Sequence, residues 1–469
     1  MLCRSLGFKF TSHIKKIKPE RCLGTAYNKY FNNKYFKSIE PHIVKTRNLF
    51  YLPSNLVFNQ YKNDLCQVPL IKSFSNNLNK TYLRNFIKIS DTEDAITVST
   101  TTSKVIVDWQ DNQTSKFHNI WLRDHCKCSE CYHQITKQRL LDTFSIPEDI
   151  KAISTSPGPE GIEIKWNDEH KSFFKWGWLR RHSYDPKFID NQKILNIRKT
   201  LWNAGIKDCP PIVQYIDVMN TKEGLASLLK NISEFGFCFI DDVPHAVKET
   251  EELAKRICFI RETHYDLEHG DTAYTTLPLR AHTDNTYFTD PSGLQMFHLI
   301  EFDGKGGSSL LVDGFYVARQ LRTKSPTAYE TLSTITIPTH SAGDPNTLIQ
   351  PTPNGYPILN HDPLLNNSLY QIRYNNDDRS TMNHLESEQV LEFYDALRKW
   401  NSLLKDKHNE YWFQLKPGRV VIFDNWRVLH GRDKFSGHRR LIGCYLNWDD
   451  YQSRLKISHL SQKEILESL

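Results

Sequence analysis

The chain from residue 271 to residue 446 is a succession of short apolar segments separated by glycine- and proline-containing turns. Examples are SGLQMFHLIEF, GGSSLLVDGF, SLYQIRYNN and RVVIFDNW, which contain the β-branched and aromatic residues typical of strands. One amphipathic segment, roughly residues 387 to 406, predicts a long helix within this series. Many short strands interrupted by one helix favour a double-sheet jelly roll.

Two helical patterns precede these strands. NTKEGLASLLKNISEF predicts a helix capped by a threonine, and KETEELAKRICFIRETHY, residues 248–265, predicts a second amphipathic helix. The segment GFCFIDDV between them predicts a buried strand. Residues 203–214 are polar and contain prolines, which predicts a linker, and SKVIVDW further upstream predicts a strand of a separate unit. The sequence therefore predicts a mainly β chain with flanking helices, divided into a small domain (86–200) and a larger one (210–460).

A histidine and an aspartate stand one residue apart in LRAHTDNTYF, residues 279–288. Side chains two apart on a strand point to the same face, so His282 and Asp284 would aim an imidazole and a carboxylate at one point. Taken alone, such a pair is more often two polar residues on a surface strand. His430 follows the strand RVVIFDNW and completes the two-histidine, one-carboxylate set of non-haem Fe(II) oxygenases. We expect Arg439, nine residues later, to pair bidentately with the distal carboxylate of 2-oxoglutarate.

Three of the ten cysteines are clustered in WLRDHCKCSECYHQ. Cys126, Cys128 and Cys131 are spaced too tightly for unstrained mutual disulfides but suitably for three thiolates around one ion. Structural zinc takes a fourth ligand, and His170, beside an Asn-Asp turn between two strand-like runs, is the best candidate. The alternative is three reduced surface thiols, with no metal.

The excess positive charge of the chain is confined to its N-terminus. Residues 1–60 contain eleven Lys and Arg against two Glu, which gives +9, so the rest carries −3 of the total of +6. The body of the chain therefore gives no reason to expect a nucleic-acid partner. A basic segment with Ser and Thr and few acids is typical of mitochondrial targeting, although a disordered basic tail is the alternative. We expect residues 1–85 to be a targeting segment with a poorly structured leader, and the chain to enter the mitochondrial matrix. We expect no membrane span, because no apolar run approaches about 20 residues.

The segments HTDNTYF, LVDGF, RYNN, KPGRVVIFDNWRVLHGR and WLRDHCKCSECY together resemble the γ-butyrobetaine and trimethyllysine hydroxylase family. The resemblance extends from about residue 117 to about residue 455. It implies a small zinc-binding β domain followed by a double-stranded β-helix (jelly-roll) oxygenase domain that uses Fe(II), 2-oxoglutarate and ascorbate. His170 stands where the family places its fourth zinc ligand. The resemblance also implies a small-molecule substrate and a homodimer.

The same resemblance implies roles for further residues. Ser309 would be a second contact of 2-oxoglutarate beside Arg439. Both branches of the family hydroxylate a substrate that ends in a quaternary trimethylammonium, which cannot donate hydrogen bonds and is held by aromatic faces through cation–π attraction. Tyr265, Tyr274 and Tyr445 match the positions of that aromatic cage.

The other end of the substrate distinguishes the two branches. Asp271 stands where the butyrobetaine branch carries a neutral asparagine, and its carboxylate would receive the α-ammonium of trimethyllysine. QIRYNNDDR resembles the trimethyllysine branch and puts Asn375 and Arg373 near the substrate carboxylate. The resemblance therefore implies hydroxylation of N6-trimethyllysine at C3, with formation of succinate and CO2, as the first step towards carnitine.

One stretch departs from the family pattern. Only DLEH, residues 266–269, separates Tyr265 from the segment GDTAY, where the family has a longer loop with a cage tryptophan. Loss of a tryptophan removes the best cation–π surface, which puts affinity for trimethylammonium in doubt. The short loop makes a non-catalytic zinc- and iron-binding relative one alternative, and a γ-butyrobetaine hydroxylase, the other branch of the family, is the second.

Overall fold

The structure is a computed structural model that describes residues 95–188, 195, 197–261, 275–343, 347–352, 354–364 and 366–469. The expected targeting segment and leader, residues 1–85, lie outside the described residues. Among the helices of the described residues, none is both long enough and apolar enough to cross a membrane.

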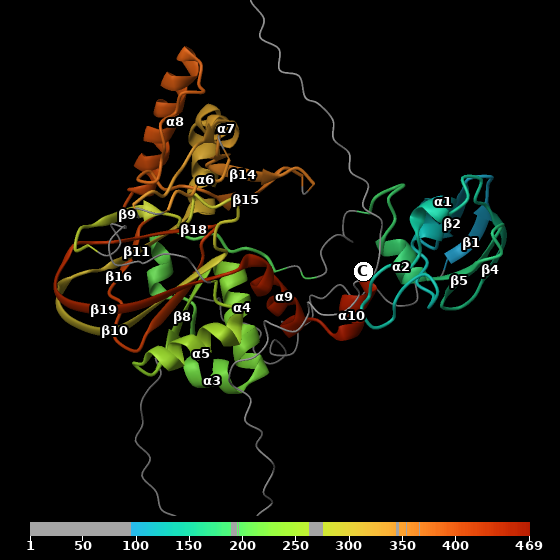
Figure 1. Ribbon diagram of the computed structural model, residues 1–469, viewed down its shortest axis with the longest axis horizontal. Coiled ribbons are helices and arrows are strands. Elements are labelled where there is room, and N and C mark those ends of the chain that lie inside the picture. Colours follow the sequence, from blue (N-terminus) through green and yellow to red (C-terminus); the bar gives the residue numbers. More distant parts are fainter. Residues whose placement is uncertain are drawn as a thin grey trace, which may run out of the picture. The chain divides into compact units, whose positions relative to one another are not determined.

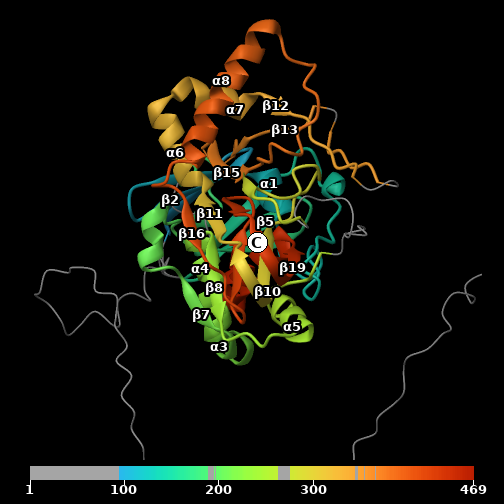
Figure 2. The ribbon, with the colours of Figure 1, turned by 90° about the vertical axis from the view of Figure 1, so that its left-hand side faces the viewer.

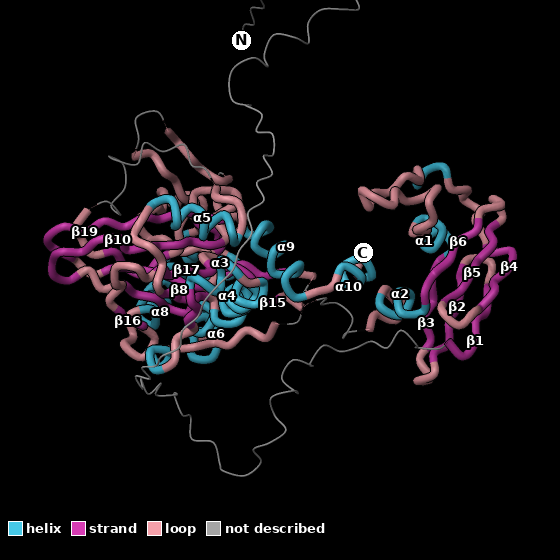
Figure 3. Tube along the Cα trace, turned by 90° about the horizontal axis from the view of Figure 1, so that it is seen from below, coloured by secondary structure: helices cyan, strands magenta, loops and turns pink. Residues whose placement is uncertain are grey.

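The N-terminal part of the described chain contains two antiparallel three-stranded sheets, visible in Figure 3. The first has the strand order β1 (Ala95–Thr100), β2 (Lys104–Trp109) and β3 (Thr114–His118), and the second β4 (Ala152–Pro157), β5 (Gly161–Trp166) and β6 (Lys171–Lys175). Two short helices, α1 (Asn119–Asp124) and α2 (Trp176–Arg181), follow β3 and β6. Every second residue of β2 is buried, and Val107 and Trp109 of β2 share one core with Ile164 and Trp166 of β5.

The C-terminal part contains a five-stranded sheet packed against a four-stranded sheet (Figures 1 and 2). The first has the order β19 (Phe435–Leu446), β10 (Leu294–Gly306), β17 (Val420–Asp424), β8 (Phe237–Asp241) and β7 (Ile212–Gln214). The second has the order β16 (Tyr411–Phe413), β11 (Ser309–Asp313), β18 (Val428–Arg432) and β9 (Leu279–His282). Neighbouring strands are antiparallel except β7, which is parallel to β8. The jelly roll that the strand pattern predicts is confirmed.

Helices cover the outer face of each of these two sheets (Figures 1 and 2). The buried strand β17 shows the layering, because Val420 and Ile422 contact the helices while Val421 and Phe423 face the other sheet. The five-stranded sheet is covered by α3 (Tyr215–Asn220), α4 (Lys222–Phe235), α5 (Val247–Ile257) and α9 (Trp448–His459). The four-stranded sheet is covered by α6 (Gly314–Lys324), α7 (Pro326–Thr334) and α8 (Ser387–Leu404), beside the two-stranded pairs β12 (Thr336–Ile337) with β13 (Tyr356–Pro357) and β14 (Leu359–Asp362) with β15 (Ser368–Ile372). A last helix is α10 (Gln462–Glu467).

Local signals set the bounds of α4. Its N-cap is the predicted threonine, Thr221, whose Oγ1 accepts a hydrogen bond from the Gly224 nitrogen at 2.9 Å. Its C-cap is Gly236, with φ of 81°, where a Cβ would lie 2.8 Å from Val428 Cγ2. A left-handed residue with no room for a side chain requires glycine, so the helix ends here and β8 begins at once.

Two expectations about elements are wrong in their bounds. The helix predicted over residues 248–265 ends at Ile257, because the next residues are extended and Ile260 bridges to Leu446 at the edge of the five-stranded sheet. The segment 203–214 is not a simple linker, since its last residues form β7 and pair with β8. In both places a sheet edge provides backbone partners that the local pattern does not reveal.

Candidate active site and metal centres

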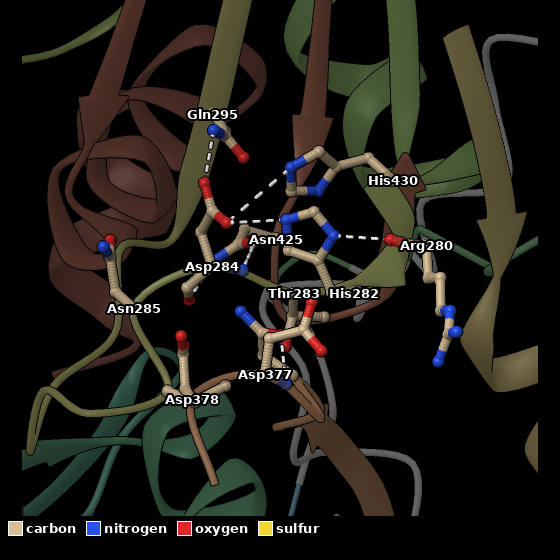
Figure 4. Close-up of polar contacts among 12 residues, drawn as sticks. Arg280, His282, Thr283, Asp284, Asn285, Gln295, Asp377, Asp378, Asn425 and His430 are labelled. Atoms are coloured by element: carbon tan, nitrogen blue, oxygen red, sulfur yellow. Dashed lines mark hydrogen bonds and ion pairs between the residues drawn. The ribbon is translucent and has the colours of Figure 1, made fainter. Parts of the chain in front are cut away.

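Strand pairing brings two histidines together inside the jelly roll. His282 is the last residue of β9, and it stands directly opposite His430 of β18 in the register of the two strands. The ring centroids lie 4.3 Å apart, and Figure 4 shows the two rings side by side. Residues opposite each other on antiparallel strands share one face, so both imidazoles point to the same place.

Asp284 joins these histidines because of a turn. Its Oδ1 lies 3.1 Å from His282 Nε2 and 3.8 Å from His430 Nε2 (Figure 4). However, β9 ends at His282, so the expectation that strand alternation aligns the two ligands is wrong. Instead, buried Asn425 holds the Asp284 backbone: its Oδ1 accepts from the Asp284 nitrogen at 2.9 Å and its Nδ2 donates to the Asp284 oxygen at 3.0 Å.

The charges in this cluster are strongly coupled. Burial lowers the pKa of His282, but the hydrogen bond and the charge of Asp284 outweigh it and raise the pKa to about 9. Burial and the neighbouring His282 lower the pKa of His430 to about 3. Burial would raise the pKa of Asp284, yet the two histidines hold it well below its usual range. The site therefore stabilises a carboxylate beside one positive charge, and a divalent cation can take the place of the His282 proton.

The tautomer of His282 suits metal binding. Its Nδ1 donates a hydrogen bond to the Arg280 carbonyl oxygen at 2.7 Å, so Nε2 is the nitrogen that faces Asp284, and its lone pair becomes available to an ion that replaces its proton. The two Nε2 atoms and the carboxylate oxygen all lie within 4.8 Å of one another. Two imidazoles and one carboxylate are the donor set of non-haem Fe(II) sites with open positions, so the residues present fit that ion.

Arg439 and Ser309, the expected contacts of 2-oxoglutarate, lie on strands of opposite sheets. Arg439 is in β19 opposite Phe302, and Ser309 is in β11 opposite Arg432. Burial and the nearby Arg432 lower the pKa of Arg439 to about 10. Within the described residues no carboxylate pairs with Arg439, whose guanidinium lies 5.6 Å from the Phe435 ring centroid. A half-buried arginine without a carboxylate partner suits an anionic ligand.

The expected substrate residues differ in where the structure places them. The Tyr445 hydroxyl donates to Asp284 Oδ2 at 2.7 Å. Asn375 lines, together with His282, a pocket of about 340 Å³ between β9 and α8. Arg373 is buried and directed elsewhere, because its guanidinium donates to the carbonyl oxygens of residues 286, 288 and 289 and stacks on the Tyr356 ring. Tyr265, Asp271, Tyr274 and the short stretch 266–269 lie outside the described residues.

Two residues next to the cluster carry no obvious motif in the sequence. Asn425 holds the Asp284 backbone, and Gln295 Nε2 donates to Asp284 Oδ2 at 2.6 Å. Gln295 is the one amide in the apolar run LQMF, and Asn425 lies in the turn of IFDNW. A polar residue that interrupts a buried strand was the available signal for Gln295.

The second cluster is in the N-terminal part. His170 Nε2 lies 3.3 Å from Cys126 Sγ, 3.6 Å from Cys128 Sγ and 3.5 Å from Cys131 Sγ. A tetrahedral zinc with Zn–S of about 2.3 Å and Zn–N of about 2.0 Å has an S···N edge of about 3.5 Å. Burial raises the pKa of Cys131 to about 12 in the absence of an ion, and Arg123, which donates to Cys131 Sγ at 3.3 Å, opposes this rise. The predicted hairpin of β5 and β6 carries His170 to the three cysteines, and the set fits a structural zinc site.

Comparisons with known proteins agree with this division. Residues 206–445 match the model of the taurine catabolism dioxygenase TauD, TfdA family, and residues 96–180 match the model of the γ-butyrobetaine hydroxylase-like N-terminal region. A trimethyllysine dioxygenase of Meyerozyma guilliermondii is 41% identical over 387 residues, which cover 78% of this chain and 96% of the relative.

Two further relatives carry the names of two related activities. The mitochondrial trimethyllysine dioxygenase of Homo sapiens is 41% identical over 349 residues, which cover 72% of this chain and 82% of the relative. A γ-butyrobetaine dioxygenase of a Pseudomonas species is 30% identical over 367 residues, which cover 76% of this chain and 94% of the relative. The chain therefore belongs to the TauD, TfdA family of dioxygenases, and within it to the group that contains the trimethyllysine dioxygenases.

Proposed function

We propose that this chain is an Fe(II)- and 2-oxoglutarate-dependent dioxygenase that hydroxylates N6-trimethyllysine at C3, the first step of carnitine biosynthesis. The observation that carries the proposal is the convergence of His282 Nε2, Asp284 Oδ1 and His430 Nε2 within 4.8 Å. The choice of substrate is supported by identity of about 40% to trimethyllysine dioxygenases, against 30% to a γ-butyrobetaine dioxygenase.

Different residues of the jelly roll would bind the iron and the co-substrate. His282, Asp284 and His430 would hold the iron through three positions, which leaves the remaining positions for co-substrate and dioxygen. When bound, the iron would supply the activation of dioxygen at the expense of 2-oxoglutarate: one oxygen atom ends in the C–H bond of the substrate and the other in succinate, with release of CO2. Arg439 would bind the distal carboxylate of 2-oxoglutarate, with Ser309 as a second donor. The missing carboxylate partner of Arg439 among the described residues supports this role.

The substrate would be held at both of its ends. We propose that Tyr265, Tyr274 and Tyr445 hold the trimethylammonium through their aromatic faces. The position of Tyr445, in hydrogen-bond contact with a metal ligand, supports its place beside the reacting centre.

At the amino-acid end, Asp271 would pair with the α-ammonium, and Asn375 would face the carboxylate. Asn375 has support from the pocket that it shares with His282. The backbone contacts of Arg373 favour an indirect part, in which it shapes the segment 286–289 that follows the metal ligands.

We also propose a structural zinc in the N-terminal part, held by Cys126, Cys128, Cys131 and His170. Four protein ligands leave no open position, so this ion would serve folding rather than chemistry. The proposed domains are a leader (1–85), a zinc-binding domain (86–200) and an oxygenase domain (210–460), and the two family models, at 96–180 and 206–445, support them.

We propose a location for the enzyme, an oligomeric state and a further requirement of its reaction. The basic residues 1–60 and the mitochondrial designation of the human relative support a location in the mitochondrial matrix. The family resemblance supports a homodimer and a requirement for ascorbate.

The experiment is mass spectrometry of trimethyllysine incubated with the purified chain, Fe(II), 2-oxoglutarate and ascorbate. We expect the gain of one oxygen atom, matched by formation of succinate, and no gain with His430→Ala. Parallel incubation with γ-butyrobetaine tests the nearest alternative. Succinate without oxidation of trimethyllysine would overturn the proposed substrate, and no succinate with any candidate would overturn the proposed activity.

A further inference from the structure

The two oxygens of the Asp284 carboxylate have different partners. Oδ1 faces the two histidines, at 3.1 Å from His282 Nε2 and 3.8 Å from His430 Nε2. Oδ2 accepts two hydrogen bonds, from Gln295 Nε2 at 2.6 Å and from the Tyr445 hydroxyl at 2.7 Å. Figure 4 shows the Gln295 amide on the side of the carboxylate away from the imidazoles. One oxygen is thus directed at the metal position and the other is fully occupied by the protein.

Sheet pairing builds this pair of donors. Gln295 of β10 and Tyr445 of β19 stand directly opposite each other in the register. Their chain neighbours, among them Leu294, Met296 and Leu446, pack with the covering helices. Gln295 and Tyr445 therefore project from the inner face of the five-stranded sheet, towards the sheet that carries both histidines. The five-stranded sheet therefore holds the Asp284 carboxylate through Oδ2, while Oδ1 faces the histidines of the four-stranded sheet.

The Gln295 side chain lowers the stability of the fold at its position. Its side chain is 3% exposed, and its Oε1 has no hydrogen-bond partner within the described residues. A buried polar atom without a partner costs about 1–3 kcal/mol, which an apolar side chain would avoid, as Leu299 does on the same strand. Turning the amide around would set Oε1 against the carboxylate, so only Nε2 can face Asp284. Stability alone does not account for an amide here, whereas the hydrogen bond to a metal ligand does.

We propose that Gln295 and Tyr445 are positioning residues that make Asp284 a one-oxygen ligand of the iron. The inference rests on the proposed function, because it requires an ion between the three ligands. A carboxylate held by Oδ2 offers the metal one oxygen and occupies one position, which keeps the rest of the coordination sphere available. Without the two donors the carboxylate turns about its Cβ–Cγ bond and presents either oxygen or both.

The test is a titration with Mn(II) of the full chain freed of iron but with its zinc retained, followed by electron paramagnetic resonance. Mn(II) suits nitrogen and carboxylate ligands and disfavours the thiolate cluster, so the titration reports on the jelly roll. The variants are Tyr445→Phe, which keeps the ring, and Gln295→Leu. The control is Tyr451→Phe on α9, which removes a buried hydroxyl whose hydrogen bond goes to the Leu229 oxygen, at 3.2 Å, and not to Asp284. His430→Ala defines loss of the site, and circular dichroism shows that each variant is folded.

We expect Tyr445→Phe and Gln295→Leu each to weaken Mn(II) binding by about 10–100-fold and to change the spectrum of the bound ion, while Tyr451→Phe stays within about twofold of the parent. Unchanged affinity and spectrum in Tyr445→Phe would overturn the inference, and so would an equal loss in Tyr451→Phe. If Gln295→Leu does not fold, Tyr445→Phe decides alone. A parent chain that binds no Mn(II) would overturn the proposed function and this inference together, whereas parental binding with silent variants overturns this inference only.

Discussion

Replacing Arg427 by methionine should destabilise the jelly roll severely. Arg427 and Asp313 form a two-point ion pair, Nη2–Oδ2 at 2.8 Å and Nε–Oδ1 at 3.1 Å, and both side chains are 0% exposed. Arg427 also donates to the carbonyl oxygens of Glu234 at 2.9 Å and Thr200 at 2.6 Å. Asp313 in turn accepts from the Trp202 nitrogen at 3.0 Å and caps α6. The pair thus joins the 200–202 segment, the end of α4, the start of α6 and the turn before β18.

The magnitude follows from what Arg427→Met leaves behind. Asp313 remains as a buried carboxylate without its counter-charge, and breaking such a pair costs about 3–5 kcal/mol. Adding Asp313→Asn removes the uncompensated charge, and an asparagine oxygen can still accept from the α6 backbone. We therefore expect the double variant to recover part of the loss, with a coupling energy of roughly 2 kcal/mol or more, within the range of contacting residues.

The assay is urea unfolding at fixed metal content, analysed by linear extrapolation. The matched control is Arg419→Met, because Arg419 makes a similar two-point contact with Asp241, at 2.5 and 2.7 Å, but with side chains 29% and 23% exposed. That substitution should cost only about 1 kcal/mol. Equal losses for Arg427→Met and Arg419→Met, or a double variant as unstable as the sum of its singles, would refute the reasoning that burial sets the cost.

Three further outcomes are expected. Burial raises the pKa of Asp424 to about 6, above the usual value of about 3.9, so its contribution to stability is present at acid pH and is lost as pH rises from about 4 to 6. The free energy of unfolding of Asp424→Asn should therefore rise relative to the parent by up to about 3 kcal/mol across that range. A difference in urea unfolding that does not change with pH contradicts this. His170→Ala should lose the zinc found by elemental analysis and lower the melting temperature of the N-terminal sheets, while Mn(II) binding by the jelly roll persists; a full zinc content would count against the ligand set. Thr221→Ala should cost about 1 kcal/mol by removing the α4 cap, and unchanged urea unfolding would show that the cap is not needed.

The parts of the fold that local patterns control were predictable. The helix expected over residues 387–406 is α8, Ser387–Leu404, and Thr221 caps α4 as its residue type suggests. The hairpin that carries His170 to the cysteines was readable from a turn between two apolar runs. The bounds that depend on a distant partner were not, because the end of α5 and the strand β7 are both set by pairing with a sheet edge.

The candidate site shows the same distinction at the level of single residues. His282, Asp284 and His430 were found, and the structure brings them together, but the reason given for Asp284 was wrong. Its position depends on Asn425, which lies 141 residues away and bonds both its backbone groups. Gln295 was missed for a similar reason, because its partner is chosen by sheet packing rather than by neighbours in the chain.

The opposition of His282 and His430 across β9 and β18 has a consequence for the lifetime of the protein. These ligands meet only after the strands have paired, and Asp284 is fixed from the other sheet, so an unfolded chain offers an ion no comparable site. Binding to the folded state alone shifts the folding equilibrium by mass action, by about 2.7 kcal/mol when free ion is at 100 times its dissociation constant. Iron supply would then control how much of the protein survives proteolysis as well as how much is active.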